Sequence, residues 1–337
     1  MADAEIRKEA AGEKAPLLQV DHLKTHFDVT KGLFSPKQIV KAVDDVSFYV
    51  GEGETYGLVG ESGCGKSTLG RTLVKIYPAT GGKVLYKGRD IARLGKEEEK
   101  HFRKEVQMIF QDPYASLNPR MTVGEIIKEP MEIHGILDSS KDREDRAAEL
   151  LKTVGLKPDH IRRYPHEFSG GQRQRISIAR TLALNPRFII CDEPISALDV
   201  SIQAQIINLL AQLQRELELT VLFISHDLRV VRHITHRVMV MYLGSNVEVG
   251  PTEAIFQHPA HPYTQVLTKA APKLDPLNRQ RDYAIEGEPP PPPRHPRRSL
   301  RPHPRGGDPD PPAHPLLSPQ REAPAARPLP LLQGQPV

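Results

Sequence analysis

Glycines, a lysine and a serine near residue 60 have the types and spacing that bind nucleotide phosphates. The segment reads Gly60-Glu61-Ser62-Gly63-Cys64-Gly65-Lys66-Ser67-Thr68. It fits the pattern G-x-x-x-x-G-K-[ST], in which backbone N–H groups and the start of a helix surround an anion. In such a loop Lys66 reaches the β- and γ-phosphates, and the Ser67 hydroxyl binds Mg²⁺. The sequence therefore predicts a nucleoside triphosphate site, with a chance glycine-rich turn as the alternative.

Two further candidate groups follow short apolar segments, which we expect to be strands of a parallel sheet. Residues 106–110 end at Gln111, and residues 188–191 end at Asp192-Glu193. Side chains at the carboxyl ends of parallel strands face the ligand crevice. There Asp192 is placed to hold Mg²⁺, Glu193 to act as general base toward water, and Gln111 to sense the phosphate or its metal.

A histidine and a serine-glycine motif complete the set of chemical candidates. The apolar segment 221–224 leads to His226, which is placed to contact a γ-phosphate. The motif is Ser169-Gly170-Gly171-Gln172, in which Ser169 is a good N-cap and the glycines expose N–H groups at the positive end of a helix. This motif predicts a second anion site that lacks a lysine, or else a purely structural helix cap.

Elements of an α/β fold are expected around these residues. The alternating segments 17–29 and 39–50 predict half-buried strands, and residues 55–59 predict the strand that enters the glycine-rich loop. The segments with helical periodicity are 69–76, 97–104, 122–134, 143–154, 172–184 and 200–217. Three of these helices, between residues 122 and 184, predict a helical insertion carried on the α/β core.

Composition excludes several classes of protein. The chain has 337 residues and a formal net charge of +4, so there is no strong electrostatic case for a nucleic-acid partner. Cys64 and Cys191 fit a reduced protein without a disulfide framework, and Cys64 is either a low-pKa, reactive thiol or simply a small residue at a variable position. Residues 1–16 are charged and alanine-rich, which predicts a flexible N-terminus and no signal peptide. No apolar run is long enough to span a bilayer.

In order and spacing, these motifs together resemble the ATP-binding cassette (ABC) ATPases over about residues 17–250. The resemblance implies an α/β fold with a RecA-like P-loop core, an antiparallel β subdomain and an inserted α-helical subdomain at about 112–185. It also implies that ATP and Mg²⁺ are bound. Either Phe27 or Phe34 would stack on the adenine.

The same resemblance implies a role for each matching residue. Glu193, His226 and Gln111 would be catalytic, and Ser67, Gln111 and Asp192 would hold the metal. Residues 60–68 would bind the nucleotide, together with the signature motif at Ser169 to Gln172 and the D-loop residue Asp199. In this family two cassettes pair head to tail and each signature motif closes over the partner's nucleotide, so one chain alone should hydrolyse ATP poorly.

Flanking segments look like those of the oligopeptide/dipeptide permease ATPases, particularly the second, F-type, subunit. They are residues 31–34, 111–119, 164–168 and 258–264. The resemblance implies a peripheral subunit on the cytoplasmic face of the membrane. It would pair with a sister ATPase beneath two membrane permeases, which an extracytoplasmic substrate-binding protein supplies. A groove around residues 111–121 would receive a coupling helix of the permease, and residues 251–287 would be the C-terminal extension of these transporters.

The sequence departs from that pattern after residue 287. Residues 288–337 are dense in proline, arginine and histidine and contain no cysteine, so no cysteine-ligated iron–sulfur cluster can form there. The segment could be a disordered tail rich in polyproline II, a partner-docking segment or the product of a shifted reading frame. Two alternative functions also stay open: a cytosolic ABC protein of translation or DNA maintenance, and a regulatory cassette that does not hydrolyse ATP. The sequence does not name the transported substrate.

Overall fold

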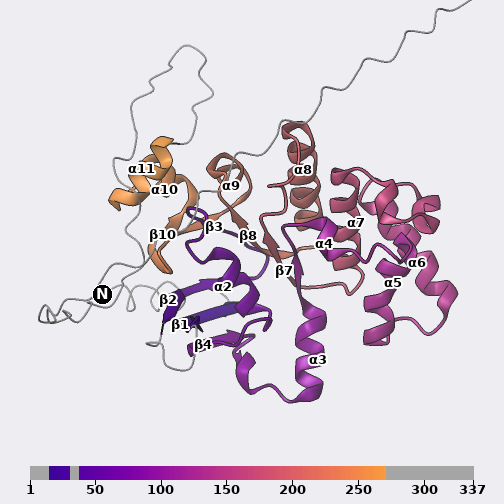
Figure 1. The fold of residues 1–337 in the computed structure, drawn as a ribbon, viewed down its shortest axis with the longest axis horizontal. Helices are drawn as coiled ribbons and strands as arrows, with labels where there is room; N and C mark the ends of the chain where they lie inside the picture. The colour runs from indigo at the N-terminus through magenta and orange to yellow at the C-terminus, as the bar shows by residue number, and fades with distance from the viewer. Residues whose placement is uncertain (1–14, 31–37, 271–337) are drawn as a thin grey trace, which may run out of the picture. The chain divides into compact units, whose positions relative to one another are not determined.

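The computed structural model describes residues 15–30 and 38–270. All of them belong to the first of two units into which the chain divides, Met1–Glu288. Two β-sheets and a group of helices make up this part (Figure 1). The expectations for residues 1–14, for Phe34 and for the segment after residue 270 lie outside the described residues.

A six-stranded sheet forms the core that positions the candidate residues. Its order is β10-β9-β3-β8-β7-β6, and all neighbouring strands are parallel except β10, which pairs antiparallel with β9. β3, β7 and β8 are buried along their whole length, as their nearly continuous apolar sequences require in a parallel sheet. The bounds are β3 (Thr55–Val59), β6 (Val106–Ile109), β7 (Phe188–Asp192), β8 (Thr220–Ser225), β9 (Arg237–Tyr242) and β10 (Ser245–Pro251).

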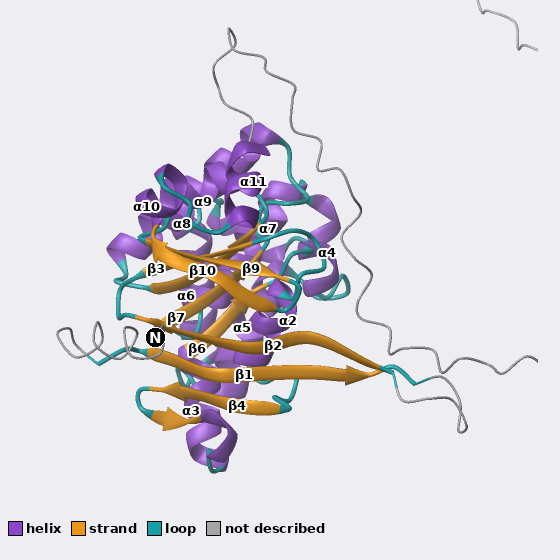
Figure 2. Cartoon of the chain, turned by 90° about the vertical axis from the view of Figure 1, so that its left-hand side faces the viewer, coloured by secondary structure: helices purple, strands orange, loops and turns teal. Residues whose placement is uncertain are grey.

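A second, antiparallel sheet has the order β2-β1-β4-β5. Its strands are β1 (Leu18–Asp28), β2 (Ile39–Val50), β4 (Gly81–Tyr86) and β5 (Arg89–Asp90). Figure 2 shows β1, β2 and β4 as a group of strands separate from those of the six-stranded sheet. Alternating residues of β1 are buried, and they share a hydrophobic core with Tyr56 and Leu58 of β3.

A group of helices is inserted between β6 and β7, and Figure 1 shows α5, α6 and α7 together, apart from the antiparallel sheet. Its members are α4 (Pro113–Ser116), α5 (Val123–His134), α6 (Ser140–Thr153), the short 3-10 helices Pro158–Arg162 and Pro165–Glu167, and α7 (Gly170–Leu182). The other helices are α2 (Lys66–Leu73), α3 (Lys96–Glu105), the 3-10 helix Ile91–Arg93, α8 (Val200–Glu216), α9 (Leu228–Ile234), α10 (Thr252–Gln257) and α11 (Pro262–Ala270). Within the described residues, no helix has the length and apolarity needed to cross a membrane.

Several helix starts differ from the sequence prediction, and two of them lie at the candidate motifs. α2 begins at Lys66 rather than at residue 69, because Gly65 ends the loop in a left-handed conformation (φ 107°) and acts as the N-cap. α7 begins at Gly170 rather than at residue 172, because the N-cap Ser169 and Gln172 form a capping box that brings both glycines into the first turn.

Candidate functional site

The glycine-rich loop connects β3 to α2. Gly60 has a φ of 153°, and a Cβ there would lie 2.2 Å from the carbonyl oxygen of Met241, so only glycine fits. The Lys66 side chain is almost completely buried. Its Nζ donates to the carbonyl oxygens of Gly60 (2.8 Å) and Glu61 (2.7 Å). The ammonium group is therefore held at the centre of the loop by backbone carbonyls, where an anion would meet it.

The Ser67 hydroxyl at the start of α2 meets the end of β7. Ser67 Oγ donates a hydrogen bond to Asp192 Oδ1 at 2.7 Å. Asp192 is fully buried, and burial raises its pKa even though the Ser67 hydrogen bond and nearby Arg71 oppose that shift. Its second oxygen, Oδ2, has no hydrogen-bond partner and lies 3.8 Å from an Arg71 nitrogen. A buried carboxylate oxygen without a hydrogen bond, beside a hydroxyl, suits a hard cation such as Mg²⁺.

Three candidates from three strand ends meet at one carboxylate. Gln111 Nε2 follows β6 and donates to Glu193 Oε2 at 3.1 Å. His226 Nδ1 follows β8 and lies 3.3 Å from the same oxygen. Glu193 itself has a φ of 46°, an uncommon left-handed conformation for a residue with a side chain, and such conformations cluster at functional sites. Because Asp192 precedes Glu193, these three residues and the Ser67–Asp192 pair form one site.

The serine-glycine motif and Asp199 lie together but apart from that site. Gln172 and Ser169 cap α7 reciprocally, through Gln172 N to Ser169 Oγ (3.4 Å) and Ser169 N to Gln172 Oε1 (3.0 Å). A Cβ at Gly171 would lie 2.4 Å from Ile202 Cγ2, so α7 and α8 approach closely at this glycine. Asp199 is the N-cap residue of α8 without a capping side-chain hydrogen bond. Figure 1 places α7 in the helical group, away from α2, so the chain does not bring its own motif to its own loop.

The structure also shows the surroundings of Cys64 and Phe27, for which the sequence predicted special roles. The low-pKa interpretation of Cys64 is wrong: the residue is 5 % exposed, and burial raises the pKa of its thiol although Lys66 opposes this. Cys191 is likewise buried and free. The Phe27 ring packs edge-on against Tyr77, with 5.2 Å between ring centroids, and its stacking on adenine stays a prediction.

Sequence reasoning missed two residues at the site. Arg71 lies one helical turn after Ser67, and this i, i+4 spacing could have indicated that both face Asp192. Tyr263 of α11 contacts the loop through the backbone N–H of Glu61. No local signal reveals this contact, because the partners are 202 residues apart.

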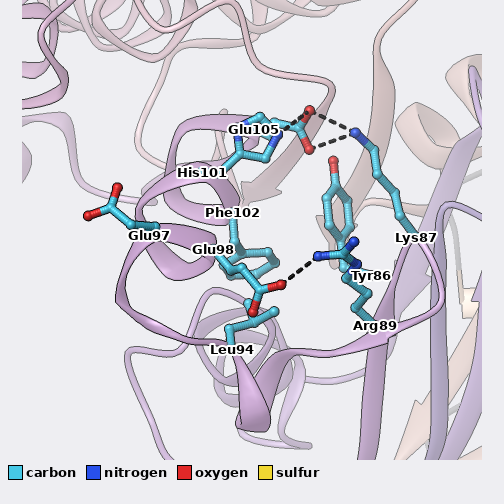
Figure 3. A pocket seen from close by; sticks show the side chains of 9 residues that line it. All are labelled: Tyr86, Lys87, Arg89, Leu94, Glu97, Glu98, His101, Phe102 and Glu105. Carbon is cyan, nitrogen blue, oxygen red and sulfur yellow. Dashed lines mark hydrogen bonds and ion pairs between the residues drawn. The ribbon is translucent and has the colours of Figure 1, made fainter.

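A pocket of about 570 Å³ lies elsewhere, between α3 and the β4–β5 end of the antiparallel sheet. Figure 3 shows two ion pairs across it: Lys87 pairs with Glu105 (2.7 Å), and Arg89 with Glu98 (2.5 Å). None of the candidate site residues lines it. These ion pairs join α3 to the sheet, and the charges they use are already matched within the protein.

Comparison with known structures defines the class of protein. The dimeric post-hydrolysis state of the ATP-binding cassette MJ0796, bound to ADP and Pi, matches with a TM-score of 0.62 and 29% identity, covering 70% of this chain and 98% of that one. The dimeric structure of MJ0796, a bacterial ABC transporter cassette, matches with a TM-score of 0.61 and 28% identity, covering 70% and 98%. The sequence model of the ABC transporter family matches residues 43–196. The expected α/β fold of an ABC ATPase is confirmed.

Proteins of similar sequence show which group of ABC ATPases the chain belongs to. A putative oligopeptide transport ATP-binding protein of Bacillus subtilis, YkfD, is 56% identical over 83% of this chain and 84% of its own length. The dipeptide transport ATP-binding protein DppF of Escherichia coli is 52% identical over 82% and 83%. Residues 247–299 match the C-terminal region of oligopeptide/dipeptide transporters. The chain belongs to the ATP-binding proteins of oligopeptide and dipeptide ABC transporters, and it is an ATPase of that family.

Proposed function

We propose that this chain hydrolyses ATP to drive the import of dipeptides or oligopeptides through separate membrane subunits. The observation that carries the proposal is the meeting of Gln111 and His226 at Glu193, in a chain whose relatives are named as peptide transport ATP-binding proteins. A glutamate held between an amide and an imidazole at the end of parallel strands has the position of a general base. The roles proposed for individual residues rest on this geometry and on membership of the family.

The residues of the loop bind the triphosphate. Lys66 leaves the carbonyl oxygens of Gly60 and Glu61 and turns to the β- and γ-phosphates, while backbone N–H groups of residues 60–68 surround the oxygens. Glu193 accepts a proton from the attacking water. His226 keeps the Glu193 carboxylate in place and reaches the γ-phosphate. Removing either side chain should therefore slow hydrolysis more than it weakens ATP binding.

Ser67, Asp192 and Gln111 would hold Mg²⁺. The protein ligands would then be one carboxylate, one hydroxyl and one amide, of which the carboxylate and the hydroxyl already lie 2.7 Å apart. This set fits Mg²⁺, which usually takes one or two carboxylates and completes its shell with phosphates and water. When bound, the ion neutralises charge on the phosphates. Gln111 donates its Nε2 to Glu193 and so has its Oε1 available for the metal.

A second cassette completes the site. Ser169 to Gln172 start α7, which Figure 1 shows in the helical group away from α2, so they act on the nucleotide of a partner. Asp199, at the start of α8, would act beside them. The partner is a sister ATPase, and the pair works beneath two permeases supplied by an extracytoplasmic binding protein. No nucleic acid takes part. This arrangement puts the chain on the cytoplasmic face of the membrane as a peripheral subunit.

The segment after Gln111 links the permease to the signature motif. Tyr114 of α4 is 65% exposed, and its ring faces the Arg173 guanidinium at 3.6 Å. The Arg173 Nε donates to the carbonyl oxygen of Phe168, the residue before Ser169. A coupling helix that presses on Tyr114 would thus reach the start of α7 through a cation–π contact and a hydrogen bond.

The test is ATP hydrolysis by the full chain, alone and co-assembled with a sister ATPase and permease subunits of this transporter class, with Glu193→Gln as the control. We expect little phosphate release from the lone chain, a marked rise in the assembly, and its loss with Glu193→Gln. Peptide accumulation in vesicles that carry the assembly reports transport. Rapid hydrolysis by the lone chain that survives Glu193→Gln would contradict the catalytic assignment and the coupling together.

A further inference from the structure

Tyr263 connects the C-terminal region of the chain to the phosphate loop. This residue belongs to α11, which follows the six-stranded sheet, and its hydroxyl oxygen accepts a hydrogen bond from the backbone N–H of Glu61 at 3.1 Å. α11 lies beyond residue 250, where the cassette expected from the sequence ends. The bond therefore makes one peptide group of the loop depend on a helix outside the core.

The peptide group between Gly60 and Glu61 is held at both ends. Tyr263 accepts from its N–H, and Lys66 Nζ donates to its C=O at 2.8 Å. Under the function proposed above, Lys66 releases that carbonyl when it turns to the phosphates. Tyr263 is then the partner that remains. Rotation of this peptide is otherwise easy because Gly60 has no Cβ to restrict its ψ angle.

The position of Tyr263 is itself well fixed. Its ring packs against Tyr242 of β9, with 4.4 Å between ring centroids. Glu248 of β10 accepts the backbone N–H groups of Ala260 (2.8 Å) and His261 (3.0 Å), just before α11. Burial acts to raise the pKa of Glu248, but the nearby Thr264 hydroxyl and the hydrogen bonds from these two amides outweigh it and lower the pKa, so the carboxylate stays charged at neutral pH. Burial raises the pKa of Tyr263 to about 12, so its hydroxyl stays neutral.

We propose that Tyr263 is a positioning residue for ATP binding. Its hydroxyl holds the Gly60–Glu61 peptide in the orientation that binds ATP, once the hydrogen bond from Lys66 to the Gly60 carbonyl has broken. The inference rests on the proposed role of Lys66 in binding the phosphates. It predicts that the C-terminal region sets the affinity of the cassette for ATP. The chemical step should be unaffected because Tyr263 touches neither Glu193 nor the reacting phosphate.

The decisive variant is Tyr263→Phe in the full chain, assayed in the assembly. It removes only the hydroxyl and keeps the ring against Tyr242. The matched control is Tyr242→Phe, since within the described residues the Tyr242 hydroxyl has no hydrogen-bond partner. For Tyr263→Phe we expect KM for ATP to rise about three- to ten-fold, the range of one net hydrogen bond, with kcat within about twofold. Tm should fall by no more than about 2–4 °C, because the same bond also exists without nucleotide. Tyr242→Phe should leave all three values unchanged.

A second measurement tests the bond directly. Amide hydrogen exchange in the full chain should show protection at Glu61 that Tyr263→Phe removes and Tyr242→Phe keeps. An unchanged KM with Tyr263→Phe, an equal rise with Tyr242→Phe, or a parallel fall in kcat and Tm would each overturn the inference. Lys66→Ala separates the two proposals. If it binds ATP like the wild type, the proposed phosphate site is wrong; if it loses binding while Tyr263→Phe does not, only the role of Tyr263 is wrong.

Discussion

His226 follows β8 and Glu193 follows β7, yet His226 Nδ1 lies 3.3 Å from Glu193 Oε2. The contact exists because β7 and β8 are parallel neighbours whose carboxyl ends lie at the same edge of the sheet. Under the proposed function, it ties the general base Glu193 to a second group that reaches the γ-phosphate. Both residues should therefore be needed for the chemical step, whereas ATP binding rests on the loop.

His226→Ala should lower kcat by about 10²-fold or more and leave the dissociation constant for ATP within a few-fold of the wild type. The readouts are phosphate release by the assembled transporter and equilibrium nucleotide binding. His233→Ala is a matched control, because His233 is an exposed histidine on α9 away from the site. Weakened binding with an unchanged kcat would mean that His226 is a binding group only.

Asp192→Asn should stabilise the nucleotide-free protein while abolishing hydrolysis. The carboxylate is fully buried and its pKa is raised by burial, so its charged form opposes folding at neutral pH. Asparagine keeps the oxygen that accepts from Ser67 and removes the charge. We expect Tm without nucleotide to rise by about 2–4 °C, the shift that about 1 kcal/mol produces in a protein of this size. A lower Tm in calorimetry would show that the Arg71–Asp192 contact outweighs the burial of the charge.

Gly171→Ala should destabilise the fold and Gly170→Ala should not. The new methyl group would lie 2.4 Å from Ile202 Cγ2 at position 171 but 3.4 Å from Leu198 Cδ2 at position 170. Overpacking of this kind costs about 1–3 kcal/mol, which exceeds the gain in helix propensity. Urea unfolding of both variants measures the difference, and equal stabilities would mean that α7 and α8 separate at little cost.

Glu105→Gln should reduce the loss of stability in acid. Burial raises the pKa of Glu105, but Lys87 and Tyr86 outweigh it and hold the pKa below the usual 4.5. Above pH 4.5 the ionised carboxylate therefore stabilises the fold, and this contribution is lost as the pH falls toward the folded-state pKa. Between pH 6 and pH 3 the Tm of the variant should fall less than that of the wild type. Glu97→Gln on the same helix is the control and should follow the wild type.

The strand ends were predictable from the sequence because each apolar segment stops at a polar residue. This signal identified Gln111, Glu193 and His226, and the parallel sheet brings their side chains together. The start of α2 was not predictable in the same way. In the sequence Gly65 reads as part of a loop. Its role as N-cap depends on a left-handed conformation, which a glycine can adopt but which its presence in the sequence does not predict.

The contact between Tyr263 and Glu61 was beyond sequence reasoning for a different reason. It depends on the path from β10 to α11, which Glu248 fixes through two backbone N–H groups. Each of those residues has an unremarkable local pattern. Only the folded chain shows that the same helix start places a phenol against the loop. The domain boundaries inferred from the motifs stay predictions.

The bond from Glu61 to Tyr263 uses the main chain on one side and a side chain on the other. Evolution can therefore change the residue at position 61 freely without losing the contact, and only proline, which has no N–H, is barred. Position 263 has no such freedom, because the acceptor is the hydroxyl at the end of a six-membered ring. A library that randomises both positions and is selected for tight ATP binding should recover many residues at 61 and should favour tyrosine at 263.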